Sequence, residues 1–357
     1  MTTGLRQGAR QPWLLVIPVL TDLFIWLAPP LVVTELLRRF LLVWEGLLRA
    51  TTPSGQLGAM ESVLEGAQDA LMQVGTQINL VEMITGNWLN APSAVAAAQS
   101  PRLTFITDMI LAPVGIGLKL PPIAAAPWQG QPIEMKSAGV ALLIMLALWL
   151  VGQVLVALYL WWAIAGWPQE SKEASSGAAA RTRAPGGLRL VGQLMLFSVL
   201  LGLAIFTLRL PLGAAVTLMV LSGSPVSALL FAAIGGITLW ALLWFLISVF
   251  FVSEAMLLDG QPLWRSALQS VAVIRGQGLR MIALIITINL VMVGFRAVWG
   301  ILGRTPGGAV VAIVGNAFLA TGMLLAVFAY YDELHRLWRA RRAQARSSWD
   351  PHIQMRE

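Results

Sequence analysis

The stretch AGVALLIMLALWLVGQVLVALYLWWAIAG, from Ala138 to Gly166, decides the fold class. It is apolar along its length and contains no Asp, Glu, Lys or Arg. An α-helix needs about 20 such residues to cross a hydrocarbon core of about 30 Å. The stretch therefore predicts a transmembrane helix.

The same length criterion, applied outward from this stretch, gives five further spans: Pro12 to Val33, Leu190 to Leu210, Val226 to Val252, Arg280 to Gly300 and Gly308 to Tyr331. Apolar sequence continues past Pro211 to Leu221, so residues 211–221 either extend one span or form a separate half-helix. The N-terminal stretch starts like a signal peptide, but it is long and lacks a small-x-small cleavage site, which favours a retained span. We predict an all-α, polytopic membrane protein with about six transmembrane helices plus amphipathic interfacial helices.

The overall composition agrees with a bilayer protein. Hydrophobic residues make up 57% of the 357 residues and charged residues only 11%, with a mean hydropathy of +0.76, whereas soluble domains carry about a quarter charged residues. The absence of cysteine excludes disulfides and thiolate metal sites. The net charge of +7 comes from Lys and Arg beside the spans, so we expect no nucleic-acid partner.

The distribution of Lys and Arg predicts the orientation. Basic residues gather in the N-terminal arm, in the linker after the second span and in the C-terminal tail, which fall on one side of an even-span topology. By the positive-inside rule this side is the cytoplasm. We therefore expect a multi-pass protein of a bacterial inner membrane with both termini cytoplasmic.

The chain divides into six predicted segments. These are a cytoplasmic arm with the first span (1–33), an extracytoplasmic amphipathic-helical segment (34–137), the second span (138–166), a flexible basic cytoplasmic linker (167–189), a four-span bundle (190–331) and a basic cytoplasmic tail (332–357).

The extracytoplasmic segment begins with an amphipathic helix, TELLRRFLLVWEGLLR, whose polar side carries i,i+4 pairs of Glu35 with Arg39 and Glu45 with Arg49. A second amphipathic helix follows from Met60 to Ile78. We expect both to lie on the membrane or over the mouths of the spans. The short apolar stretch Leu103 to Ile116 favours a re-entrant or surface helix.

Three polar residues lie deep in predicted spans: Asp22, Asn289 and Arg296. A charge at mid-membrane costs at least about 2.5 to 3.5 kcal/mol unless it is paired or hydrated. We interpret Asp22 and Arg296 as a structural ion pair that locks two helices, with Asn289 extending the polar seam. The alternative is a substrate or proton path through these residues.

Other patterns favour structural interpretations. Small residues at every fourth position, among them Ala228, Ala232 and Gly236, or Gly308, Ala312, Asn316 and Ala320, predict close helix packing, with a partner-binding face as the alternative. His335 and His352 read as solvated tail residues. The chain lacks the common nucleotide, zinc-protease and hydrolase motifs. We predict no enzyme activity, no catalytic residues, no cofactor and no metal.

The segment from Pro262 to Ile274 predicts a helix lying flat at the cytoplasmic surface. Its apolar face contains Leu263, Trp264, Ala267, Leu268, Val271 and Ile274, and the opposite face contains Arg265, Ser266, Gln269 and Ser270. Basic residues near a membrane surface are attracted by anionic headgroups. Trp264, Arg265 and Arg275 are therefore the candidate lipid contacts.

This segment also carries a resemblance to a known family. A span that ends in the acidic turn Asp259-Gly260 is followed by A-L-x-S-x-x-x-x-R-G at residues 267–276 and by another span. Over Leu188 to Tyr331 the chain resembles the bacterial inner-membrane families typified by the membrane region fused to some glycerophosphodiester phosphodiesterases. In that group the membrane region is not the catalytic one, so the resemblance implies a fold more than an activity.

Taken with the charge pattern, these features favour a non-enzymatic membrane protein that acts as a scaffold, regulator or accessory subunit of a membrane assembly. Its expected partners are the lipid bilayer, anionic headgroups and another membrane protein. A transporter or permease with a path near Asp22, Asn289 and Arg296 is the alternative, and a membrane enzyme would need a cluster of titratable residues at a span mouth. The sequence shows no such cluster.

Overall fold

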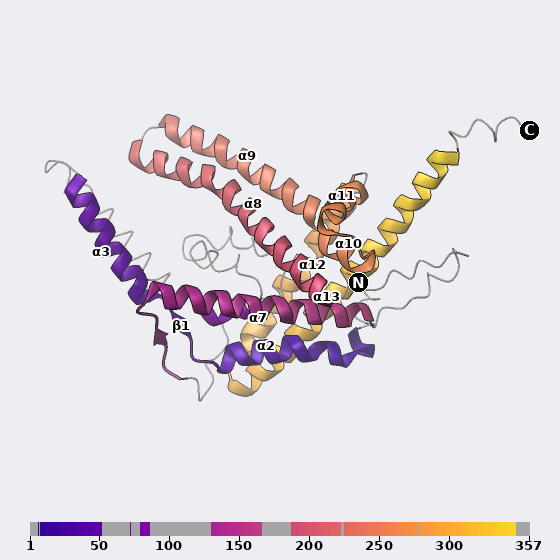
Figure 1. Cartoon of the computed structure of the whole chain (residues 1–357), viewed down its shortest axis with the longest axis horizontal. Helices are drawn as coiled ribbons and strands as arrows, with labels where there is room; N and C mark the ends of the chain where they lie inside the picture. Colours follow the sequence, from indigo (N-terminus) through magenta and orange to yellow (C-terminus); the bar gives the residue numbers. More distant parts are fainter. Residues whose placement is uncertain are drawn as a thin grey trace, which may run out of the picture. The chain divides into compact units, whose positions relative to one another are not determined.

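The computed structural model describes residues 6, 8–51, 72, 79–85, 130–165, 187–222, 225–275 and 277–347. The chain is mostly helical (Figure 1). The elements are η1 (Pro12–Leu15), α2 (Val16–Leu27), β1 (Leu31–Val32), α3 (Thr34–Thr51), η2 (Leu80–Thr85), β2 (Ile133–Glu134), α7 (Ala138–Ala165), α8 (Gly187–Ser222), α9 (Pro225–Val249), α10 (Val252–Leu258), α11 (Leu263–Ile274), α12 (Gly278–Leu302) and α13 (Pro306–Ser347).

Four helical segments are long and apolar enough to cross a membrane: Ala138–Ala165, Gly187–Ala204, Ala233–Leu258 and Pro306–Arg342. A fifth is obtained if the bent pair of Leu263–Ile274 and Gly278–Ile288 counts as one span. The two helices of that pair are inclined at 101°. The prediction of a helical membrane protein is thus confirmed at the level of four to five candidate spans.

The first predicted span is shorter than the sequence suggested. The apolar helix covers Pro12–Leu27, about 24 Å at 1.5 Å per residue, against a hydrocarbon core of about 30 Å. Ala28 is extended, with φ −67° and ψ 144°, because proline disfavours helical geometry in the residue before it and cannot continue a helix. The prolines at 29 and 30 therefore end the helix, and residues 31–32 form β1 instead.

Two other helices are longer than predicted. Helix α8 runs without interruption from Gly187 to Ser222, so residues 211–221 are not a separate half-helix. Helix α13 continues from Pro306 to Ser347, about 63 Å at 1.5 Å per residue. The first part of the predicted basic tail is thus an extension of the last span.

The chain forms two compact units. The first contains residues 1–14, 160–290 and 319–357, and the second contains residues 15–159 and 291–318. In the first unit, α8 lies beside α9, and α11 contacts both α9 and α10 (Figure 1). The most deeply buried large side chains of this unit include Phe251, Met256, Met281, Phe328 and Tyr331.

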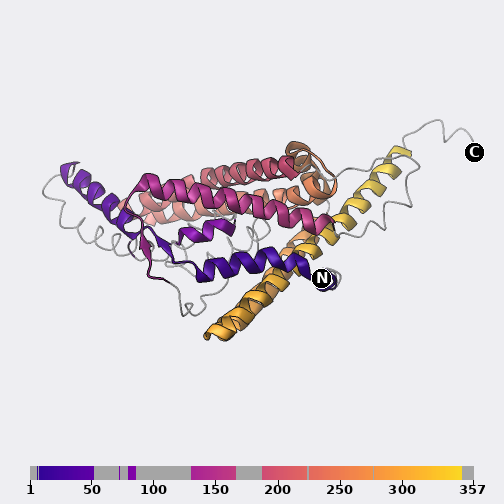
Figure 2. The same cartoon turned by 60° about the horizontal axis from the view of Figure 1, so that its bottom comes forward.

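In the second unit, α2 packs against the first part of α13 (Figure 2). Trp26 lies against Ala309 and Ile313 there. Of the small-residue pattern predicted on this helix, Ala312 and Asn316 are buried, whereas Gly308 and Ala320 are only partly buried and Gly236 of the pattern in α9 is exposed. A two-residue parallel sheet pairs Leu31 with Ile133 and Val32 with Glu134, a small departure from the all-α prediction.

Parts of the predicted extracytoplasmic segment are described. Helix α3 forms as expected, and the Nε of Arg39 lies 3.0 Å from Oε1 of Glu35. The second amphipathic helix apart from residue 72, the Leu103 to Ile116 stretch and most of the linker at 167–189 lie outside the described residues.

Candidate functional site

Helix α11 follows a tight turn. Gly260 adopts a φ of 64°, a left-handed conformation that glycine reaches without steric cost. Pro262 then stands at the N-cap of α11, with φ −66°. A helix at this segment is confirmed as Leu263–Ile274, and its position at the membrane surface stays a prediction.

The orientation of α11 differs from a simple amphipathic reading, in which its serines face away from the protein. Ser266 and Ser270 are fully buried, whereas Trp264 and Leu268 are 74% and 56% exposed. The Ser270 hydroxyl donates to the Ser248 carbonyl at 2.7 Å and accepts from the Phe251 backbone N–H at 3.2 Å. Both backbone groups lie at the break between α9 and α10, and helix ends leave such groups without intrahelical partners. Ser270 therefore faces inward and satisfies both groups.

The three predicted lipid-contact residues lie on the outside of the first unit. Trp264, Arg265 and Arg275 are all exposed. Their position agrees with contact to a headgroup layer, but lipid binding itself stays a prediction.

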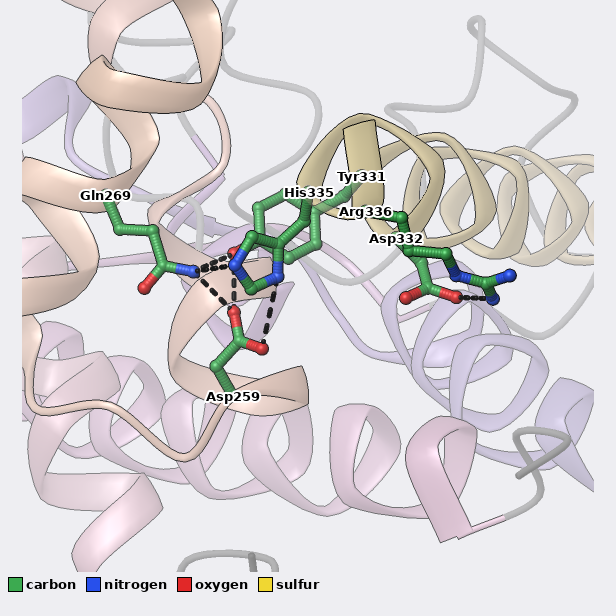
Figure 3. A network of polar contacts seen from close by, with 6 residues as sticks. All are labelled: Asp259, Gln269, Tyr331, Asp332, His335 and Arg336. Carbon is green, nitrogen blue, oxygen red and sulfur yellow. Dashed lines mark hydrogen bonds and ion pairs between the residues drawn. The ribbon is translucent and has the colours of Figure 1, made fainter. Parts of the chain in front are cut away.

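Four polar side chains from three parts of the chain meet beside α11 (Figure 3). We name Asp259, Gln269, Tyr331 and His335 the Asp259 clamp. The Oδ2 atom of Asp259 accepts from Gln269 Nε2 at 2.7 Å and from the Tyr331 hydroxyl at 2.6 Å. Its Oδ1 atom lies 3.3 Å from Nδ1 of His335. The clamp ties the end of α10 and the middle of α11 to α13.

The clamp geometry fits one arrangement of protons. Gln269 Nε2 lies 3.0 Å from Nε2 of His335 and 2.9 Å from the Tyr331 oxygen. An amide nitrogen only donates, and the two N–H groups of Gln269 are shared among Asp259, Tyr331 and His335, so the contact favours the tautomer in which the imidazole Nε2 accepts. The proton of a neutral imidazole is then on Nδ1, where it faces the Asp259 carboxylate.

This proton arrangement decides what the clamp does chemically. An imidazole oriented by a carboxylate is the usual form of a general base, but in the clamp its accepting nitrogen is used by Gln269. The described contacts of the clamp link α11 to α13 and to the turn before α11.

An aromatic row on α13 extends the clamp. Ring centroids are 5.2 Å apart between Phe251 and Tyr331, 5.5 Å between Tyr331 and His335, and 5.7 Å between His335 and Trp338. The Arg342 guanidinium lies 4.3 Å from the Trp338 ring centroid, a cation–π contact. On the neighbouring side of α13, Arg336 pairs with Asp332.

The prediction that His335 is a solvated tail residue is wrong. Its side chain is only 8% exposed. The signal that identifies it is the helical spacing of Tyr331, His335 and Trp338, which places three rings on one face. His352 lies outside the described residues.

The clamp also perturbs the pKa of Asp259. Burial alone would raise this pKa, but hydrogen bonds with His335 and Tyr331, and a weaker one with Gln269, outweigh burial and lower it below its ordinary value. Asp259 is therefore a carboxylate at neutral pH, as the three surrounding donors require.

A second polar contact lies in the second unit, where α2 meets α13. Asn316 Nδ2 donates to Oδ2 of Asp22 at 3.4 Å, and both residues are buried. Next to it, the Thr21 hydroxyl donates to the Ile17 carbonyl at 2.8 Å. From the sequence we predicted Asp22 as a polar site, but we interpreted Asn316 only as part of a small-residue pattern.

The predicted partners of Asp22 lie in α12. The backbones of Asn289 and Arg296 are helical, but their side chains lie outside the described residues. The Asp22 to Arg296 ion pair and the Asn289 seam therefore stay predictions.

Within the described ranges, no group of three or more His, Asp or Glu side chains is placed to hold a metal ion. Comparisons of the chain with protein-family models, with curated proteins and with solved structures gave no match. The resemblance proposed for Leu188 to Tyr331 therefore stays a prediction.

Proposed function

We propose that the chain is a six-span inner-membrane protein with both termini in the cytoplasm, which acts without catalysis as a scaffold, regulatory or accessory subunit of a membrane assembly. The observation that supports this function best is the Asp259 clamp. Its polar atoms are directed at one another, so it holds α11 in place with Trp264 and Leu268 outward. An exposed surface of α11 that is held in one orientation is suited to binding a partner protein.

The sixth span in this proposal is Pro12–Leu27, added to the four long helices and to the bent pair of α11 and α12. A helix of about 24 Å is accommodated when the bilayer thins locally, at a cost of fractions of a kcal/mol per Å of mismatch. With α11 inclined at 101° to α12, α11 would lie near the membrane plane while α12 crosses the bilayer.

Single cysteines test the topology, because the chain has no native thiol. Ser137 precedes α7 and Arg339 lies in the extension of α13, and both are exposed. In intact cells an impermeant thiol reagent should label Ser137→Cys and should label Arg339→Cys only after the membrane is opened. Labelling of both variants in intact cells would contradict the six-span topology.

The subunit role is tested by native mass spectrometry of the chain released from its own membrane in mild detergent. We expect a second polypeptide at a fixed ratio to the chain. Gln269→Ala, which removes the clamp amide, should lower that ratio, and Gln131→Ala, at an exposed position before β2, should not. A chain that carries only lipid in every preparation would overturn the role.

The buried Asp22–Asn316 contact favours a second candidate, a transporter with a polar path through the bilayer. A path requires water at Asp22, which is only 7% exposed. Asp22→Cys should then react with a water-soluble thiol reagent, and Leu20→Cys, which is exposed on the same helix, should resist it because lipid covers it. Resistance of both variants would speak against a path.

A further inference from the structure

Helix α3 carries an apolar stripe that is exposed in the part of the chain that the structure describes. Phe40, Val43, Trp44 and Leu47 follow the i, i+3, i+4, i+7 spacing of one helix face. All four are exposed, from 48% for Trp44 to 72% for Val43. Four large apolar side chains in water would be costly, and α3 is not among the helices apolar enough to cross a membrane.

The N-terminal end of this stripe is packed against other parts of the second unit. Val33 and Leu36, two turns and one turn before Phe40, pack against a buried cluster of Leu80, Met135 and Ala141. Ala141 lies in the first turn of α7, and Ile144, one turn later, packs on the same cluster. The stripe thus starts at the mouth of α7, a candidate span, and continues past it with the side chains of Phe40, Val43 and Trp44 exposed.

The base of α3 is held firmly at that mouth. Strand β1, two residues before α3, pairs with β2, four residues before α7 (Figure 1). The backbone N–H of Met135 donates to the Val32 carbonyl at 3.0 Å. Because α7 is itself a candidate span, this anchor fixes the start of α3 at the level where the chain enters the bilayer.

The charged groups of α3 lie away from the stripe. Arg38 and Arg39 both bond to Glu35, at 2.9 Å and 3.0 Å. Hydrogen bonds from Arg38 and then Arg39 lower the pKa of Glu35 to about 2, so the group stays ionised at neutral pH. The trio forms a polar side opposite the apolar one, and the Phe40 and Trp44 rings lie 6.1 Å apart on the stripe. Aromatic residues with this exposure are typical of a membrane–water boundary.

We infer that α3 lies in the headgroup layer of the leaflet at which α7 begins, with Phe40, Val43, Trp44 and Leu47 in contact with phospholipid acyl chains. The partner is the bilayer that α7 crosses, because the stripe is continuous with the packing at the mouth of α7 and carries no charge. Which leaflet this is rests on the proposed topology, but the lipid contact does not.

A matched pair of spin labels tests this contact. Phe40 and Leu42 are each 56% exposed, yet they lie about 200° apart around the helix. Full-length Phe40→Cys and Leu42→Cys variants would be labelled and reconstituted in vesicles of phosphatidylcholine and phosphatidylglycerol. Power saturation then compares collision with oxygen, which concentrates in lipid, and with a water-soluble nickel complex.

We expect the label at residue 40 to collide severalfold more with oxygen than with nickel, and the label at residue 42 to show the reverse. Equal access of nickel to both labels would overturn the inference, and so would shielding of residue 40 from both reagents, which would mean that protein covers the stripe. Adding Leu47→Glu should raise nickel access at residue 40 severalfold, and a Leu47→Glu variant that leaves it unchanged would count against lipid contact. An inverted topology in the cysteine labelling would leave all these expectations intact.

Discussion

The Tyr331 hydroxyl donates a hydrogen bond of 2.6 Å to Oδ2 of Asp259, a residue 72 positions earlier in the chain. Tyr331 is fully buried, and the Asp259 side chain is 20% exposed. One bond thereby connects the last long helix to the turn before α11. Removing it should show how much of the packing of α11 depends on α13.

Tyr331→Phe keeps the ring against Phe251 but removes the donor. A hydrogen bond to a charged group contributes about 1.5 to 3 kcal/mol, so the variant should unfold at a lower temperature in detergent. The matched control is Tyr330→Phe, whose ring centroid lies 6.4 Å from that of Phe251 and whose hydroxyl has no hydrogen bond to the described residues. Equal losses in the two variants would mean that the ring, not the bond, matters.

The clamp predicts how stability depends on pH. The pKa of Asp259 is lowered in the folded chain, so its contribution is complete above the unfolded pKa of about 3.9 and is lost as pH falls through the lower folded value. The difference in melting temperature between the wild type and Asp259→Asn should be constant above about pH 5 and should shrink toward pH 3. A difference that grows on acidification would contradict the sign of this shift. Glu333→Gln, at an exposed position of α13, is the control.

Asp22 and Asn316 should be energetically coupled. Asn316→Ala removes a donor from a buried carboxyl group, which typically costs about 1 to 3 kcal/mol. A double-mutant cycle of Asp22→Ala with Asn316→Ala should give a coupling of about 0.5 to 3 kcal/mol, read from thermal unfolding in detergent. A parallel cycle of Asp22→Ala with Arg296→Ala tests the ion pair that the sequence suggests, and additive losses in either cycle would exclude that pair.

Two adjacent glycines at the start of α13 should respond in opposite ways to alanine. A Cβ at Gly308 would lie 1.8 Å from the Leu302 carbonyl oxygen, whereas a Cβ at Gly307 would meet nothing within 4 Å. Gly308→Ala should therefore destabilise the chain by about 1 to 3 kcal/mol, the usual cost of overpacking. Gly307→Ala should be neutral or stabilising by up to about 1 kcal/mol, because alanine favours the helix. Thermal unfolding of the two variants checks this, and similar melting temperatures would contradict it.

Hydropathy predicted the long apolar helices well, because about 20 consecutive apolar residues are what a helix needs to cross a bilayer. It overestimated the first span, because apolar residues after Pro29 and Pro30 counted toward its length although the helix ends at Leu27. Pro29 and Pro30 were the feature of the sequence that could have predicted this helix end.

It was harder to predict which face of each helix packs against the rest of the protein. The sequence predicted that the polar side of α11 faces away from the protein, yet Ser266 and Ser270 are buried and Ser270 bonds to backbone groups of Ser248 and Phe251. The same limitation hid His335, whose partners Asp259 and Gln269 come from distant positions. A substitution such as Gln269→Glu, harmless if the residue faced solvent, instead places a second carboxylate beside Asp259.

The pairing of β1 with β2 brings together the two ends of a segment of about a hundred residues between Val32 and Ile133. The entropy of closing a chain segment varies only with the logarithm of its length, so halving or doubling it changes the cost by about 0.6 kcal/mol. In topological terms the segment is an insertion whose entry and exit coincide. Residues gained or lost within it leave α2 and α7 joined at the same point, so the segment can change in length while the pairing of β1 with β2 is kept.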